Sequence, residues 1–480
     1  MWASFLLPAF LLFVSLVSTA PPETEQNQGS TIETNGREYR VFQSTVTGAR
    51  VEYVENSGVC EMMFGVTQYS GYIVLETPNQ IKNIWFWFFA SRNAPQTAPL
   101  AAWFNGGQDP GCSSMIGLFR ENGPCQFYYG NNYQPSLNMY SFNQYANMLY
   151  IDQPVDTGFS YGNITDTNTA ESAAVIWGAL QAFYEAFPRF QNRDFGIFTE
   201  GYGGHYGPAF SKHILDQNNR IEKGETLGQR INLVALGVNN GWFDPYINWE
   251  SQIHYSYSNS HRQLISAAEL DTYLQDFRQK CVPELDECAP GDQYICRNAI
   301  ETCSRAIEGP LSQKADFNTY DIRKPRPNDN APQPYDNYLQ LRDIKWQIGA
   351  RYRYSECTMD VDSAFNNAGD HAVSFLPVLE AVAAANVTVL IWAGDADWKH
   401  NWYGNLEVAK TLKHAGQEEF NSKELVPYTV NGVELGSFKS AGKLSFLRVY
   451  NAGQMVMYEQ PKLSLQVFMQ TMKQRAIFST

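Results

Sequence analysis

The sequence predicts an α/β fold with a mostly parallel central sheet flanked by helices. Six apolar, β-rich runs end in loops of Gly, Asn and Asp, at residues 98–107, 147–154, 194–204, 231–241, 386–397 and 444–454. Runs that stay apolar without alternation are typical of strands buried on both faces of a sheet. Helical patterns lie between and after them, most clearly at residues 171–190 and 461–474. Because strands and helices alternate, we expect ligands at the carboxyl ends of the strands.

The chain opens with an apolar segment from about Phe5 to Val17, followed by small residues. This pattern predicts a signal peptide at residues 1–20, although no Lys or Arg precedes the segment. A short membrane anchor is the weaker alternative, because a span needs roughly 18 apolar residues. Sequons at Asn163 and Asn386 predict N-glycosylation. We therefore expect a mature protein without a membrane span, either secreted or held in the secretory pathway or vacuole.

The 480 residues carry a formal net charge of −14, and 44% of them are hydrophobic. That hydrophobic share is typical of a protein with a globular core. The negative charge argues against nucleic acid and anionic membranes as partners, since both need clustered Lys and Arg. No phosphate loop, dinucleotide fingerprint or H-E-x-x-H motif is present, so we expect no cofactor and no metal.

The alternation of strands and helices breaks between about residues 242 and 376. This stretch holds five of the eight cysteines, several short helical patterns and the Pro/Asn-rich segment "RKPRPNDNAPQPYDN". Because the strand pattern resumes afterwards, an insertion that caps the active edge of the sheet explains the break better than a separate domain. We therefore predict a core in two parts, 21–241 and 377–480, with a cap insertion at 242–376.

Eight cysteines favour an oxidising compartment and a disulfide framework. Four of them have nearly palindromic spacing, which favours the nested pairs Cys281–Cys303 and Cys288–Cys296. Zinc binding by this cluster is the alternative, but no C-x-x-C motif or flanking His set supports it. The other four remain for two long-range bridges: Cys60, Cys112, Cys125 and Cys357.

The stretch "FTEGYGGHYGPAF" at residues 198–210 has the context of a strand, a sharp turn and a helix. In esterases and peptidases built on this elbow, the residue at the turn is the Ser of G-x-S-x-G. Here that residue is Gly201. Glycine adopts positive φ with little penalty, so we expect Gly201 to make the turn more stable than Ser would.

Seven blocks along the chain resemble, in order, the signature motifs of the serine carboxypeptidases. They are "WFNGGQDPGCSS", "LFRENGPC", "MLYIDQPVDTGFSYG", "FTEGYGGHYGPAF", "NNGWFDP", "IWAGDADWKHNWYGN" and "VYNAGQMVMYEQP". The resemblance covers about residues 60–475, and seven collinear blocks are far more specific than one elbow. It implies an α/β-hydrolase fold with a disulfide-rich helical cap insertion, most similar to the secreted fungal members. It also implies the bridges Cys112–Cys357 and Cys60–Cys125.

The family's reaction uses Ser, Asp and His in that chain order. By the resemblance, Asp397 matches the orienting Asp, Gly201 stands at the nucleophile position, and Gln454 stands at the position of the base. Independently of the family, the last histidine is His414, so no imidazole lies in the final 66 residues. Glycine has no side chain to attack with, and Gln cannot accept a proton near neutral pH. The degenerate triad therefore predicts that serine peptidase activity is lost.

The oxyanion hole is altered in the sequence as well. The resemblance assigns its two backbone donors to Gly107 and Tyr202, but Gln108 and Asp109 are inserted directly after Gly107. An added carboxylate beside a site meant for a negative oxygen would oppose it electrostatically. The alternative is that the two residues bulge outward and leave the donors in place.

One recognition element matches the family residue by residue. Its members, which bind the terminal carboxylate of a substrate, are Asn105, Gly106, Glu121 and Glu200. In the family the two Glu share a proton, so that recognition favours acidic pH. We expect a peptide C-terminus or a small carboxylate as ligand. The alternative is that Glu121 and Glu200 form a merely structural buried pair.

Other departures from the family pattern suggest a remade pocket, with Asp109, Asp156, Lys399 and His400 as candidate residues. A solvated Lys-His pair on a loop is the alternative for the last two. The predicted function is a carboxypeptidase homologue without peptidase activity. It uses this pocket either for non-hydrolytic small-molecule chemistry or for binding as a pseudoenzyme. The competing prediction is a retained serine-type carboxypeptidase that releases C-terminal amino acids from peptides.

Overall fold

The computed structural model describes residues 30–107, 110–127, 134–288, 292–314, 317–326 and 334–480. Most strands of this part join one twisted sheet. Its parallel strands are β6 (Leu100–Asn105), β9 (Asn147–Ile151), β11 (Asp194–Glu200), β12 (Asn232–Asn239), β13 (Thr388–Gly394) and β16 (Leu444–Val449). These six strands are the six apolar runs of the sequence, so the predicted α/β fold with a parallel centre is confirmed.

Antiparallel strands extend the sheet at both edges. Before the parallel centre lie β1 (Ser30–Thr34), β2 (Arg37–Gln43), β3 (Arg50–Glu55), β4 (Gln68–Thr77), β5 (Gln80–Phe89) and β10 (Tyr161–Gly162). At the other edge lie β14 (Val426–Val430) and β15 (Val433–Ala441), and a separate hairpin joins β7 (Cys125–Gln126) to β8 (Ser136–Leu137). The strand order is β1-β2-β3-β4-β5-β9-β6-β11-β12-β13-β16-β15-β14. The parallel pairing of β6, β11, β12 and β13 brings the carboxyl ends of these strands to one edge.

The sheet separates two hydrophobic cores, one on each face. Alternate side chains of β5 enter them: Ile84, Phe86 and Phe88 enter one core, and Trp85, Trp87 and Phe89 enter the other. This is the period of two expected of a strand. All six side chains are fully buried, and aromatic packing of this size supplies a large part of the burial that stabilises the sheet.

Helices cover both faces. On one face α1 (Thr169–Ala186) packs against α2 (Gly203–Glu222), which also contacts α11 (Leu376–Ala384). On the other face α15 (Pro461–Met472) packs on β12 and β13. The remaining core elements are η1 (Gly117–Glu121), η2 (Phe142–Gln144), η3 (Pro188–Phe190), α12 (Trp402–Thr411), α13 (Gln417–Ser422) and α14 (Val456–Glu459).

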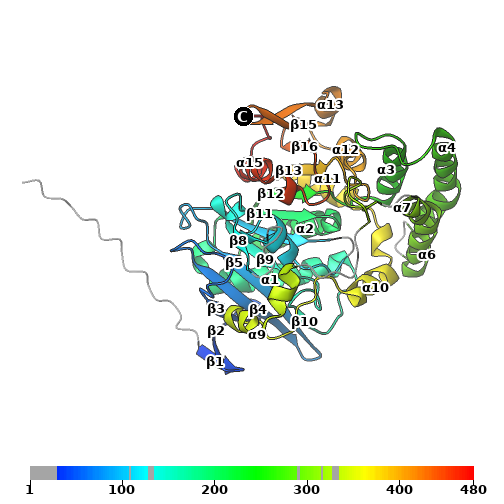
Figure 1. Ribbon diagram of the computed structural model, residues 1–480. Coiled ribbons are helices and arrows are strands. Elements are labelled where there is room, and N and C mark those ends of the chain that lie inside the picture. The colour runs from blue at the N-terminus through cyan, green and yellow to red at the C-terminus, as the bar shows by residue number, and fades with distance from the viewer. Residues whose placement is uncertain (1–29, 108–109, 128–133, 289–291, 315–316, 327–333) are drawn as a thin grey trace, which may run out of the picture.

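Residues 242–376 are helical. Their helices are α3 (Pro245–Tyr257), α4 (Ala267–Asp276), η4 (Phe277–Cys281), α5 (Val282–Cys288), α6 (Gln293–Cys303), η5 (Ser304–Glu308), α7 (Gly309–Gln313), α8 (Pro334–Gln340), α9 (Arg342–Ile348), α10 (Met359–Ala368) and η6 (Asp370–Ala372). Figure 1 shows α3, α4, α6 and α7 gathered on one side of the molecule. In contrast, α9 lies beside β2 and β4, where the Tyr39 and Ser70 hydroxyls donate to Gly349 and Ile348 carbonyls.

The four disulfides pair as the sequence predicts: Cys60–Cys125, Cys112–Cys357, Cys281–Cys303 and Cys288–Cys296. The zinc alternative for the cap cysteines is therefore wrong. The signal peptide predicted at residues 1–20 lies outside the described residues. Within the described ranges, no helix has the length and apolar character needed to cross a membrane.

Candidate functional site

The predicted elbow is present where β11 ends and α2 begins. Gly201 has φ of 59°, the left-handed conformation that suits glycine. Its N–H donates to the Asn239 carbonyl oxygen at 3.0 Å, and its own carbonyl accepts from the Trp242 N–H at 2.9 Å. The turn is thus held between β12 and the chain that follows it. Gly201, Tyr202 and their neighbours are buried.

The carbonyl oxygen of Gly107 fills the space beside Gly201. It accepts hydrogen bonds from the Tyr202 N–H at 3.4 Å and from the Gln454 side-chain amide at 3.3 Å. A Cβ atom placed on Gly201 would collide with this oxygen and would lie 2.9 Å from Nε2 of Gln454. The degenerate positions Gly201 and Gln454 therefore meet in the structure, with the Gly107 carbonyl between them.

This arrangement also occupies the predicted oxyanion hole. The Tyr202 N–H, one of its two expected donors, is hydrogen-bonded to the carbonyl oxygen of Gly107 at 3.4 Å. A negative oxygen placed near Tyr202 would face this carbonyl dipole instead of an open donor. The inserted residues Gln108 and Asp109 lie outside the described residues, so the candidate role of Asp109 stays a prediction.

Asp397 is fully buried after β13 and is bonded within the fold. Its carboxylate accepts from the Asn240 side-chain amide at 2.7 Å and from the backbone N–H groups of Lys399, at 2.9 Å, and His400, at 3.3 Å. Burial raises the pKa of Asp397 to about 8, against the lowering effect of these hydrogen bonds. Gln454 directs its amide to Gly107, as described above, so Asn240 is the side chain that orients Asp397.

Glu121 and Glu200, here called the acid pair, lie next to the elbow. Both carboxyls are almost fully buried, on η1 and at the end of β11. Burial, reinforced by the charge of Glu200, raises the pKa of Glu121 well above its usual range. Burial also raises the pKa of Glu200 to about 7. Within the described residues no other group donates to either Glu121 oxygen, and the two carboxyls are hydrogen-bonded to each other, so the proton of Glu121 lies between them.

The other two members of the predicted carboxylate-binding group are engaged within the fold. The Asn105 amide donates to Glu200 at 2.6 Å, while its oxygen accepts from the Trp103 ring at 2.5 Å and from the Gly117 N–H at 3.1 Å. The Gly106 N–H donates to the Glu200 carbonyl oxygen at 3.0 Å. The bond from Asn105 holds the carboxyl of Glu200 in place. The N–H of Gly106 is already used within the fold, so Gly106 cannot donate it to a ligand.

The candidate residues of a remade pocket lie in different surroundings. Lys399 is mostly buried and forms an ion pair with Glu308 of η5, and His400 is 1% exposed, so the alternative of a solvated pair is wrong. Asp156 has φ of 74°, and its carbonyl accepts from the Thr358 hydroxyl at 2.6 Å. Its carboxyl has a raised pKa, mainly through burial, and its charged neighbours belong to the cap segment.

A small cavity, here called the inner pocket, joins the elbow to the cap. Its volume is ≈ 220 Å³, and its walls are Tyr202, Trp242, Trp249, Ile300, Ser304, Glu308, Asp362, Asn366, His371 and Lys399. Of the sequence-predicted candidates, Tyr202 and Lys399 line it. The sequence motifs did not indicate Glu308, Asp362 and His371, because these residues lie in the cap segment and in none of the motif blocks; Glu308, for example, is 91 residues from its partner Lys399.

The asparagine residues of both sequons, Asn163 and Asn386, are exposed. The Asn163 side chain accepts from the Ile81 N–H at 2.9 Å, and Asn386 adopts φ of 65°. Both sites are on the surface of the core, away from the inner pocket walls. Glycosylation at these positions remains a prediction.

Comparison with known proteins identifies relatives over most of the chain. The serine carboxypeptidase family matches residues 59–474. Carboxypeptidase S1 from Penicillium janthinellum is 49% identical, over 89% of this chain and 100% of that protein. Carboxypeptidase Y from Komagataella phaffii is 34% identical, over 83% of this chain and 74% of its own length.

Solved structures agree on the fold. Kex1(delta)p, a prohormone-processing carboxypeptidase from Saccharomyces cerevisiae, has a TM-score of 0.68 to this chain at 23% sequence identity. The match covers 84% of this chain and 90% of that one. The elbow, the order of the strands and the matched span of residues thus have one explanation: this chain belongs to the serine carboxypeptidase family.

Proposed function

We propose that this chain does not hydrolyse peptides by the serine mechanism, and that it binds a carboxylate-bearing ligand, such as a peptide C-terminus, beside the elbow. The observation that carries the proposal is the Gly107 carbonyl oxygen, which stands where the side chain of a nucleophile would emerge from residue 201. The nucleophile is absent, and in addition the Gly107 carbonyl oxygen takes up the space that its side chain would fill.

The nucleophile and the base of the serine mechanism are both missing. Nucleophilic attack needs a side-chain oxygen at the elbow, and Gly201 has none. Proton transfer needs a base, and the Gln454 amide donates to Gly107 instead of accepting. With Ser and His both absent, the residual acceleration from binding and an oxyanion hole is about 10³–10⁴-fold over water in related enzymes. Here the Tyr202 donor is already occupied, which favours a value below that range.

Asp397 supports the same conclusion. A carboxylate that orients a catalytic imidazole must be ionised to stabilise the positive charge that forms on it. Burial raises the pKa of Asp397 to about 8, which opposes ionisation, and residue 454 offers no imidazole for Asp397 to orient. Its hydrogen bonds to Asn240 and the following loop suit a structural role.

Binding of a ligand carboxylate depends on the carboxyls of Glu121 and Glu200, and both residues are present. At a pH below about 7 the acid pair is protonated, and a protonated carboxyl donates a short, strong hydrogen bond to a carboxylate. A ligand carboxylate placed there would share protons with Glu121 and Glu200. We favour a binding protein over a catalyst of new chemistry, because the carboxyl of Asp397, one of the groups available for such chemistry, accepts three hydrogen bonds from the fold.

The four disulfides fit an oxidising compartment, so we expect the protein to act outside the cell or within the secretory pathway or vacuole. There a protein that recognises peptide C-termini meets the products and substrates of active carboxypeptidases. Sequestering such ends is the function that this site supports best.

The test combines two measurements on the purified full-length protein. The first is labelling by a fluorophosphonate probe and release of C-terminal amino acids from a blocked dipeptide at pH 5, with carboxypeptidase S1 as positive control. We expect neither labelling nor turnover. Turnover at rates near those of the control would establish a retained carboxypeptidase and overturn the proposal.

The second measurement is calorimetric titration of the same dipeptide as free acid and as C-terminal amide. We expect the free acid to bind at least about 10-fold more tightly at pH 5, because it offers two negatively charged acceptor oxygens, whereas the amide offers one neutral acceptor oxygen. Equal affinity of acid and amide would exclude the acid pair as the recognition site. A time-dependent new product in this titration would instead favour non-hydrolytic catalysis.

A further inference from the structure

We propose that the ligand is an extended peptide, and that its residues before the C-terminus occupy a second, arginine-flanked site in the cap segment. This inference rests on the function proposed above and narrows the ligand class. The favoured ligand carries an acidic side chain at the fourth to sixth position from a free C-terminus.

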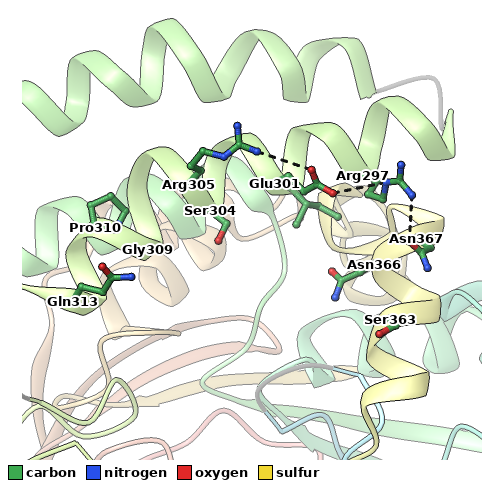
Figure 2. A pocket seen from close by; sticks show the side chains of 11 residues that line it. Arg297, Glu301, Ser304, Arg305, Gly309, Pro310, Gln313, Ser363, Asn366 and Asn367 are labelled. Atoms are coloured by element: carbon green, nitrogen blue, oxygen red, sulfur yellow. Dashed lines mark hydrogen bonds and ion pairs between the residues drawn. The ribbon is translucent and has the colours of Figure 1, made fainter.

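The second site is a cleft between the helical run α6–η5–α7 and helix α10, here called the outer cleft (Figure 2). Its volume is ≈ 900 Å³. Hydroxyl and amide side chains provide much of its lining, among them Ser304, Gln313, Ser363 and Asn366. Groups of this kind hydrogen-bond to peptide N–H and C=O groups without selecting a side chain.

The outer cleft and the inner pocket adjoin one another. Both are lined by Ile300, Ser304 and Asn366, and we assign these three residues as the neck through which a ligand would pass. The inner pocket alone, at ≈ 220 Å³, is smaller than the ~300–1,000 Å³ typical of ligand sites. A ligand that fills it and ends at the elbow therefore extends through the neck into the outer cleft.

The rim of the outer cleft is positively charged. Arg297 and Arg305 lie on either side of Glu301, at 3.9 Å and 4.0 Å from its carboxylate, as Figure 2 shows. Two guanidinium groups thus share one carboxylate in a protein whose net charge is −14. Both ion pairs are long and solvent-exposed, so they contribute little to stability. A ligand carboxylate can compete with Glu301 and form a closer, bidentate contact with either arginine.

The wall that carries these arginines is rigid. Helix α6 is tied to η4 by Cys281–Cys303 and to α5 by Cys288–Cys296. Arg297 is also fixed from the opposite wall, because it donates to the side-chain oxygen of Asn367 at 3.3 Å. A preformed wall reduces the entropy that ligand binding would otherwise lose in ordering the site.

The spacing sets the expected position of the acidic residue. Arg297 and Ser304 are seven residues apart along the helical run, about 10 Å at 1.5 Å per residue. An extended peptide covers this span with about three residues. We assign one to three further residues to the stretch from the neck to the elbow. A Glu at the fourth to sixth position from the C-terminal end would then meet the arginines.

The test uses four fluorescent heptapeptides that share one neutral sequence. They carry either Glu or Gln at the fifth position from the end, and either a free C-terminus or an amide. Dissociation constants are measured by anisotropy at pH 5.5, with the Glu also moved to the fourth and sixth positions. We expect Glu to bind about 5- to 10-fold more tightly than Gln in at least one register.

The paired design separates the two proposals. A preference for the free acid without a preference for Glu overturns the outer-cleft inference and leaves the proposed function intact. A preference for Glu that persists in the amides refutes the acid pair and retains the cleft. Equal binding of all four peptides rejects both.

Variants localise the effect. The double variant Arg297→Gln/Arg305→Gln should abolish the preference for Glu, whereas the control Arg342→Gln, at a side chain 97% exposed on α9, should retain it. A preference that survives the double variant places the acidic contact elsewhere and overturns the inference. Ser304→Phe, which narrows the neck, should weaken the heptapeptide much more than a dipeptide. Thermal unfolding verifies that each variant is folded.

Discussion

The two sides of Gly201 differ in what they leave open. On one side the Gly107 carbonyl oxygen is pressed against the glycine and accepts from Tyr202 and Gln454. On the other side Glu200, the preceding residue, forms with Glu121 a buried, hydrogen-bonded pair of carboxyls whose pKa values are both raised. Under the proposed function, the first side is closed to the reaction and the second recognises the ligand. A reaction and its recognition can therefore be separated between adjacent residues, because they depend on different atoms.

The largest expected effect comes from reopening the closed side. Gly201→Ser with Gln454→His restores both reactive side chains, but the new Cβ would meet the Gly107 carbonyl. We therefore expect this double variant to remain inert. Deleting Gln108 and Asp109 in the same background should let the Gly107 peptide withdraw and should raise activity at least about 100-fold, the range attributed to one oxyanion-hole donor.

The measurement is release of the C-terminal residue from a blocked dipeptide at pH 5. The matched control is the deletion alone, which should stay inactive because it lacks Ser and His. If the double variant is active without the deletion, the carbonyl does not block the site. The missing Ser and His side chains would then be sufficient to explain the lost reaction, without any contribution from the Gly107 carbonyl.

The second prediction concerns stability at the same contact. Gly201→Ala should destabilise the protein by about 3 kcal/mol or more, since a left-handed Ala is unfavourable by about 1–2 kcal/mol and the collision adds to it. Gly224→Ala is the matched control: its φ is 71°, but nothing lies within 4 Å of the added Cβ. We expect only about 1 kcal/mol there. Equal losses in thermal or urea unfolding would show that Gly201 is not crowded.

Much of this architecture follows from sequence patterns that act locally. The six buried runs became the six parallel strands, because continuous apolar runs have few other stable places than a sheet covered on both faces. The nested pairing of the cap cysteines follows from their short separations in the chain. The motif blocks gave the elbow and the position of Asp397 for the same reason, since each block carries its own turn.

Contacts between distant segments were not predictable in the same way. Nothing in the sequence indicates that Gly107 turns its carbonyl toward Gln454, 347 residues away, or that Lys399 pairs with Glu308 of the cap. The antiparallel strands β1–β5 were also not predicted, since they lie before the first of the six buried runs. The direction in which a peptide carbonyl points depends on all the groups packed around it, so it cannot be predicted from the spacing of residues in the sequence.

The smallest expected effect is the dependence of stability on pH that the acid pair, Glu121 and Glu200, produces. The pKa of Glu200 is raised to about 7 and that of Glu121 is also raised, both through burial. A carboxyl whose folded pKa lies above its unfolded value stabilises the fold fully below the unfolded pKa, near 4.5, and loses that contribution as pH rises through the folded pKa. Stability should therefore fall between pH 5 and pH 8, by on the order of 1–3 kcal/mol for the pair.

Asp152 and Asp397, with pKa values raised to about 7 and about 8, act in the same direction, so the slope of the unmodified protein is shared among several buried acids. Glu121→Gln removes the contribution of one member of the pair, and its melting temperature should depend less on pH than that of the unmodified protein. Glu225→Gln, at an exposed side chain, should leave the slope unchanged. If Glu121→Gln has the unmodified slope, Glu121 is ionised in the fold, and the side of Gly201 assigned to recognition holds no proton to donate.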